Sequence, residues 1–159
     1  MKEDRTTLAS RDTANPFAFL FEHAPVALLL VDRELTVLHI NRAAAALAGQ
    51  IPKAMTGRIT GVAICCKNVS AHPDGCGHGE ACGRCDLRWV ITRSLDTGDR
   101  LDLVEVNASF GTASGRKVRR LFVSSCRLTY QDEPCVLLAI QEPRADLLPA
   151  GSPSHSLAP

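Results

Sequence analysis

The sequence lacks any excess of charge and any long apolar run. It has 18 Lys and Arg against 17 Asp and Glu, a formal net charge of +1. A protein that binds nucleic acid through a broad basic face carries a clear positive excess. The longest apolar run, from Ala24 to Val31, has eight residues, whereas a membrane-spanning helix needs about 20. We therefore expect neither direct nucleic-acid binding nor a membrane span.

Cysteine is too sparse for a fold built on disulfides. The chain has seven cysteines in 159 residues, below the roughly 8–10% typical of small secreted disulfide scaffolds. Residues 1–15 are polar and lack the apolar core of a secretory signal, so we expect a disordered leader there and a cytoplasmic protein. Thiols stay reduced in the cytoplasm, and clustered cysteines then indicate metal binding or redox chemistry.

The common catalytic motifs are also missing. The sequence has no glycine-rich phosphate loop, no Gly-x-Gly-x-x-Gly after a strand and no Gly-x-Ser-x-Gly. It has no kinase signature set and no Cys-x-x-Cys-His for covalent haem. We therefore predict that the chain is not an enzyme.

What is present is the pattern of one domain. The length favours a single domain, which we place at residues 16–142. Residues 143–159 hold four of the nine prolines and no periodic apolar face, and they are predicted to be a disordered tail.

Helix signals are clear at three places. Asn15 and Pro16 are suited to begin a helix over 16–23, and Asn41 to cap one over 42–48 that ends at Gly49. A third helix is predicted from 82 or 83 to 96, with an apolar stripe formed by Leu87, Val90, Ile91 and Leu95.

Strands are predicted from apolar runs and period-two alternation, with a loop between them over 50–81. Their expected ranges are 26–31, 35–40, 101–110, 117–130 and 135–141. Helices grouped in mid-chain between two early and three late strands predict an α+β fold.

The early part of this pattern resembles a known family. Residues 19–49, FLFEHAPVALLLVDRELTVLHINRAAAALAG, are similar to the opening of a PAS domain: a short helix, a turn at 23–25, a hairpin and an Asn that starts the next helix. The likeness covers residues 16–142. It implies a single PAS-like sensor domain of signal transduction, with a five-stranded antiparallel sheet and helices in mid-chain.

A second resemblance lies in the cysteine-rich segment. Residues 61–88, GVAICCKNVSAHPDGCGHGEACGRCDLR, resemble an insert of bacterial PAS sensors with a Cys, a Gly-Cys-Gly and a Cys-x-x-Cys followed by Leu-Arg. The matching cysteines are Cys66, Cys76, Cys82 and Cys85. Such modules are usually fused to histidine kinases or other output domains. The resemblance thus implies a protein partner such as a histidine kinase or a transcription regulator.

Those four cysteines are suited to hold a metal centre. Four thiolates complete a tetrahedral zinc site or ligate an iron–sulfur cluster. A helix N-terminus lowers the pKa of a thiol beside it, and Lys67, Arg84 and Arg88 could offset the negative charge. The single Cys-x-x-Cys and the glycines among the ligands favour an iron–sulfur cluster. Zinc, a thiol/disulfide switch and inert cysteines are the alternatives.

The neighbouring candidates are weaker. Cys65, His72 and His78 lie in the same segment and could each serve as a ligand, although a spare thiol and solvent-facing histidines are the simpler interpretation. Cys126 and Cys135 fall on predicted strands, where a buried structural thiol is expected.

These observations lead to three hypotheses of function. The first is a sensor whose metal centre responds to oxygen, nitric oxide or redox state by shifting the helix over 82–96, with dimerisation through the helix over 16–23. The second is a zinc-stapled interaction module. The third is an electron carrier.

Overall fold

The computed structural model describes residues 15–112 and 115–143, without the side chains of 109–117. Its helices are α1 (Pro16–His23), α2 (Arg42–Ala48), α3 (Pro52–Met55), α4 (Thr60–Ala63) and α5 (Asp86–Thr97), with 3₁₀ turns η1 (Lys67–Ala71) and η2 (Glu80–Arg84). Its strands are β1 (Ala27–Val31), β2 (Val37–Ile40), β3 (Leu101–Thr112), β4 (Gly115–Tyr130) and β5 (Glu133–Gln141).

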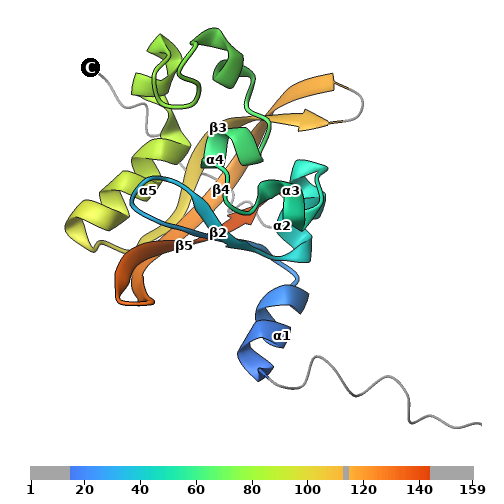
Figure 1. Ribbon diagram of the computed structural model, residues 1–159, viewed down its shortest axis with the longest axis vertical. Coiled ribbons are helices and arrows are strands. Elements are labelled where there is room, and N and C mark those ends of the chain that lie inside the picture. The colour runs from blue at the N-terminus through green and yellow to red at the C-terminus, as the bar shows by residue number, and fades with distance from the viewer. Residues whose placement is uncertain (1–14, 113–114, 144–159) are drawn as a thin grey trace, which may run out of the picture.

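The strands form one antiparallel sheet in the order β2-β1-β5-β4-β3. The last strand of the chain therefore lies in the middle, between β1 and β4. The segment between β2 and β3 supplies α2 to α5 and both 3₁₀ turns, and α5 lies across the sheet (Figure 1). The predicted α+β class, with five strands and helices in mid-chain, is confirmed.

The core lies between α5 and one face of the sheet. The predicted stripe Leu87, Val90, Ile91 and Leu95 is buried, because its 3.6-residue period keeps it on one side of the helix. Opposite it, Val136, Leu138 and Ile140 of β5 are buried at period two. A buried polar contact crosses this interface, since Ser94 Oγ and Ser125 Oγ lie 2.7 Å apart.

Several predicted bounds were wrong. Strands β4 and β5 each begin two residues earlier than predicted, at Gly115 and Glu133. The second strand begins at Val37 rather than at residue 35, since Leu35 has a φ of 65° in the turn that Thr36 N closes on Asp32 Oδ1. The predicted loop over 50–81 contains α3, α4 and η1. The long helix begins at Asp86, because the residues before it form η2.

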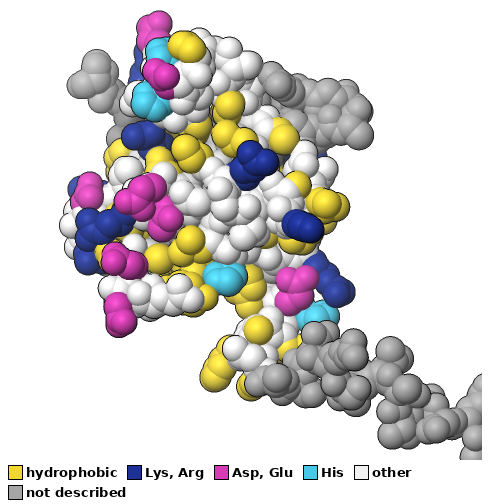
Figure 2. Space-filling model, in the orientation of Figure 1, with side chains coloured by type: hydrophobic (Ala, Val, Ile, Leu, Met, Phe, Trp, Pro, Cys, Tyr) yellow, Lys and Arg dark blue, Asp and Glu magenta, His cyan; other side chains and the backbone are white. Residues whose placement is uncertain are grey.

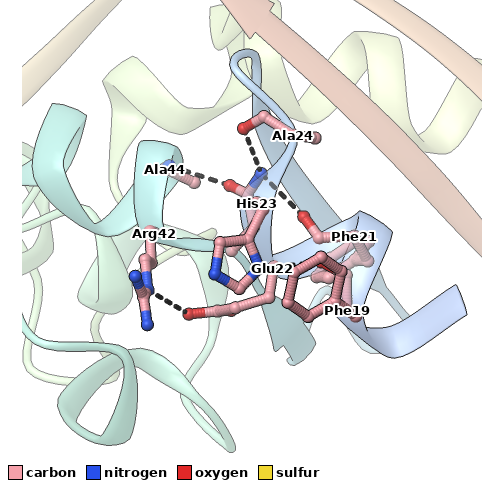
Figure 3. A network of polar contacts seen from close by, with 8 residues as sticks. Phe19, Phe21, Glu22, His23, Ala24, Arg42 and Ala44 are labelled. Carbon is pink, nitrogen blue, oxygen red and sulfur yellow. Dashed lines mark hydrogen bonds and ion pairs between the residues drawn. The ribbon is translucent and has the colours of Figure 1, made fainter. Parts of the chain in front are cut away.

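Asn41 joins α1, β1 and α2. The side chain is fully buried, and its Oδ1 accepts from Leu28 N at 3.0 Å and from Ala44 N at 2.9 Å. Its Nδ2 donates to the carbonyls of Phe21, Ala24 and Val26. The carbonyls of Phe21 and Ala24 are drawn in Figure 3, beside the ion pair between Arg42 and Glu22. This residue therefore fixes where α1 leaves the domain.

In the part of the chain that the structure describes, no helix combines the length and apolar character that a membrane crossing requires. Nearly all of the predicted disordered leader (1–15) and tail (143–159), namely residues 1–14 and 144–159, lies outside the described residues.

Candidate functional site

The four cysteines of the motif line one cavity. It has a volume of about 260 Å³, and its walls include Cys66, Cys76, Cys82 and Cys85. We call it the cysteine cavity. Cys66 follows α4, Cys76 lies between η1 and η2, Cys82 is in η2, and Cys85 precedes α5. The fold thus gathers at one place side chains that arise from separate turns of the chain.

Backbone turns set the positions of these cysteines. Cys66 N donates to Gly61 O at 2.8 Å, and Cys82 N donates to Gly79 O at 2.9 Å. Gly77 N donates to Cys82 Sγ at 3.3 Å, which is the kind of amide–sulfur bond that stabilises a thiolate or a cluster sulfur ligand.

Gly61 packs directly against Cys76. A Cβ built on Gly61 would overlap the sulfur of Cys76, so this buried position in α4 accepts no side chain unless the neighbour moves. Sequence reasoning missed Gly61, because the segment around it shows no periodic signal that would place it beside Cys76.

Burial dominates the electrostatics of two of the thiols. It raises the pKa of Cys76, against the lowering effect of the Gly61 backbone, and the neighbouring Cys82, Cys66 and Cys85 raise it further. It also raises the pKa of Cys85, although the amides of Arg88 and Leu87 act in the opposite direction. For Cys85 the predicted lowering at the helix start was therefore wrong, because desolvation outweighs those amides.

The four thiols surround the cavity but do not converge on one point. Among residues 15–112 and 115–143, no three side chains of His, Cys, Asp and Glu are grouped closely enough to hold a metal ion. The side chains therefore form no closed ligand sphere, either for zinc or for a cluster. Four cysteines around one cavity are nevertheless a donor set that both structural zinc and iron–sulfur clusters use.

The other predicted ligand candidates lie outside this lining. Cys65 has a φ of 53° and its sulfur accepts from Gln50 Nε2 at 3.1 Å. His72 and His78 stack on each other with ring centroids 5.8 Å apart, and Asp74 N donates to His72 Nδ1. Histidine and acidic side chains are visible together at the top of Figure 2, over the cysteine-rich segment. None of these three candidates is among the residues that line the cysteine cavity.

Positive side chains do border the cavity, as predicted. Lys67, Arg84 and Arg88 all line it. Lys67 is exposed, and the exposed Arg84 lies 3.8 Å from Glu80. Arg88 is half-buried and lies against Gly77. Asp86, which sequence reasoning missed, also lines the cavity, and its Oδ2 accepts from Asn107 N of β3 at 3.2 Å.

The two remaining cysteines, Cys126 and Cys135, differ in how deeply they are buried. Cys135 is fully buried, as predicted, and burial raises its pKa, with Asp32, Glu133 and Glu34 adding to the effect. Cys126 is only half-buried, because on β4 the neighbouring Ser125 points into the core and Cys126 onto the opposite face.

Sequence comparison identifies part of the chain. The family model described as "PAS domain" matches residues 17–75. No curated protein sequence matches the chain significantly.

Structural comparison extends the likeness. The PAS domain of nitrogen regulation protein NR(II) from Vibrio parahaemolyticus is 20% identical with a TM-score of 0.57, and the match covers 82% of this chain and 99% of that chain. A PAS domain from a two-component sensor histidine kinase is 12% identical with a TM-score of 0.52, covering 80% and 95%. A domain of a sensory box sensor histidine kinase/response regulator from Geobacter sulfurreducens is 19% identical with a TM-score of 0.50, covering 79% and 91%. At these identities the likeness concerns the fold, and the chain folds as a PAS domain.

Proposed function

We propose that this PAS domain is a signal-transduction sensor that holds an iron–sulfur cluster in the cysteine cavity and responds to oxygen, nitric oxide or redox state. The observation that carries the proposal is the placing of Cys66, Cys76, Cys82 and Cys85 around one cavity. They are also the cysteines by which the chain resembles the bacterial sensor insert.

The chemistry of the cavity suits an iron–sulfur cluster. The four thiols stand around a space of about 260 Å³, and the single Cys-x-x-Cys with glycines among the ligands favours a cluster over zinc, whose structural sites usually have two short-spaced ligand pairs. The Gly77 amide donates to Cys82 Sγ, and amide donors to sulfur tune a cluster's reduction potential. When bound, a cluster supplies one-electron chemistry and a centre that oxygen or nitric oxide can alter.

The chain offers a route from this cavity to the rest of the domain. Cys85 immediately precedes α5, and that helix packs on β3, β4 and β5. The segment 66–85 contains no α-helix and no strand. Loss of a bound group would release this segment and remove its hold on the N-terminal end of α5. The helix could then take up a second position on the sheet, so that a local change at the cavity gives a two-state response.

We also propose that the output passes to another protein, such as a histidine kinase or a transcription regulator, through a homodimer formed by α1. No residue of α1 is buried, and Phe17 and Leu20 are 79% and 64% exposed. Helix α1 projects from the body of the domain (Figure 1), and Figure 2 shows hydrophobic side chains at that end of the molecule. An exposed apolar helix of this kind is suited to pack against a second protein surface.

Metal analysis after anaerobic purification tests the proposal. Iron and acid-labile sulfide should co-purify with the chain, with a brown colour that fades in air. Cys76→Ser and Cys82→Ser, made separately, should each abolish both, whereas Cys65→Ser is the matched control and should retain them. A colourless protein without iron, or iron that survives both substitutions, overturns the proposal.

Two alternatives have distinct outcomes in the same experiment. A zinc-stapled interaction module would contain one zinc ion, would be indifferent to oxygen and would unfold on chelation. An electron carrier would bind the cluster, but its amide exchange would be the same in the oxidised and reduced states.

A further inference from the structure

Gly77 and Arg88, which both line the cysteine cavity, are in contact with each other. Gly77 follows Cys76 and has a φ of 98°, a backbone conformation open mainly to glycine. A Cβ at this position would overlap Nη1 of Arg88. The absence of a side chain at 77 therefore leaves the space that the guanidinium occupies.

Arg88 lies on a helix that is hydrogen-bonded to the sheet, whereas Gly77 lies in a segment without regular secondary structure. Arg88 is in the first turn of α5, which is bound to the sheet through Asp86 and Asn107 and through Ser94 and Ser125. Gly77 is in the segment between η1 and η2, outside any helix or strand. The contact thus connects the anchored helix to the turn that carries Cys76.

Charge favours the same contact. The ion pairs among the described residues include Arg84 with Glu80 but none with Arg88. Arg88 is half-buried, whereas Lys67 and Arg84 are exposed. A guanidinium without a carboxylate partner, beside four thiols and partly shielded from water, interacts more strongly with negative charge than an exposed cation does.

We infer that Arg88 is a positioning residue of the cysteine cavity: its guanidinium holds the Cys76–Gly77 turn against α5 and offsets the negative charge of whatever the thiolates bind. The first role concerns the protein alone. The second rests on the proposed function, since it requires a bound anionic centre.

Amide hydrogen exchange of the metal-free protein tests the first role. Arg88→Gln removes the charge and the fork of donors, and exchange at residues 75–82 should become about tenfold faster, as expected when a contact of about 1.4 kcal/mol is lost. Arg93→Gln is the matched control, because Arg93 is an exposed arginine of α5 that pairs with Asp99 and does not line the cavity, and it should leave exchange at 75–82 unchanged. Equal exchange in Arg88→Gln and the unaltered protein overturns the inference.

A double-mutant cycle ties the effect to Gly77. Gly77→Ala should push the guanidinium aside and speed exchange on its own. If the contact is the cause, the changes are non-additive, and Gly77→Ala adds less to Arg88→Gln than to the unaltered protein. Strict additivity would mean that the left-handed backbone of Gly77 acts alone, and it overturns the contact.

The reduction potential tests the second role. In protein reconstituted with iron and sulfide, Arg88→Gln should lower the midpoint potential, because removal of a nearby cation disfavours the more negative reduced state. Arg88→Lys should stay nearer to the unaltered value. An unchanged potential in Arg88→Gln overturns the charge role. A chain that takes up no iron overturns the proposed function instead, while the exchange experiment still decides the positioning role.

Discussion

The hydroxyls of Ser94 on α5 and Ser125 on β4 lie 2.7 Å apart in the buried interface between helix and sheet. They form a polar contact inside an apolar core, so each is satisfied only by the other. Because α5 begins at the cysteine cavity, this contact also fixes the helix that would receive any signal from it.

Ser94→Ala should destabilise the domain by about 1–3 kcal/mol, since it leaves the Ser125 hydroxyl buried without that partner. The double variant Ser94→Ala/Ser125→Ala should recover part of this loss. Urea unfolding measures both. Ser70→Ala removes an exposed hydroxyl and serves as the control. A loss in the double variant equal to the sum of the two single losses would mean that the hydroxyls do not depend on each other.

Asn41→Asp should be more damaging than its small size change suggests. The acceptor for Leu28 N and Ala44 N remains, but the group that donated to the carbonyls of Phe21, Ala24 and Val26 becomes a second acceptor. We expect a loss of about 2–4 kcal/mol and faster proteolysis at the junction after α1. Asn15→Ala, which removes the exposed cap of α1, is the control. Similar losses for both variants would contradict the central role of Asn41.

Gly61→Ala should destabilise the domain even though alanine favours a helix more than glycine does. The added Cβ would overlap Cys76 Sγ, and overpacking of this kind typically costs about 1–3 kcal/mol. Iron content should fall with it. Gly83→Ala is a matched control, since a Cβ there meets nothing within 4 Å. Thermal unfolding of both variants measures the effect. A higher unfolding temperature for Gly61→Ala would contradict the close packing of Gly61 against Cys76.

Stability should decline at alkaline pH, in part because of Cys135. Its pKa is raised in the folded state by burial and then by Asp32, Glu133 and Glu34, from a usual value of 9.0. Because the folded protein binds the thiol proton more tightly than the unfolded chain does, this group contributes to the free energy of unfolding. The contribution is fully present below about pH 9 and is lost as the pH rises through the pKa of Cys135 in the folded protein. Cys135→Ala should make this decline shallower than in the unaltered protein. Urea unfolding between neutral and alkaline pH measures the slopes, and parallel curves would rule out Cys135 as a source.

Disruption of α1 should change the oligomeric state. Phe17→Ser/Leu20→Ser removes the two most exposed apolar side chains of the helix and should convert a dimer into a monomer without altering the unfolding temperature of the domain body. Sedimentation velocity over a range of concentrations gives the answer. Trp89→Ser, at an exposed apolar position on α5, is the control. An unaltered protein that is monomeric throughout would contradict dimerisation by α1.

Local chemistry made much of this fold predictable. The bounds of α2 follow from Asn41 as cap and Gly49 as the left-handed C-terminal residue. The buried stripe of α5 follows from a 3.6-residue period. Cys66, Cys76, Cys82 and Cys85 could be singled out because clustered cysteines and the spacing Cys-x-x-Cys are visible without coordinates.

Other features depend on contacts between residues far apart in the sequence. The start of β2 was not predicted, because the turn that Thr36 closes on Asp32 leaves no periodic signal in the sequence. The helices within 50–81 were not predicted either, because they are too short to show a helical period. The rise in the pKa of Cys85 was missed for a related reason, since burial depends on what packs around the thiol.

The sequence by itself determined the α+β class, the helix caps and which cysteines belong together, because propensity, capping and spacing are local properties. Only the tertiary structure decided that those cysteines surround one cavity, that Cys65, His72 and His78 lie outside its lining, and that Gly77 lies under Arg88. These relationships join residues from separate turns, and they follow from how α5 packs on the sheet.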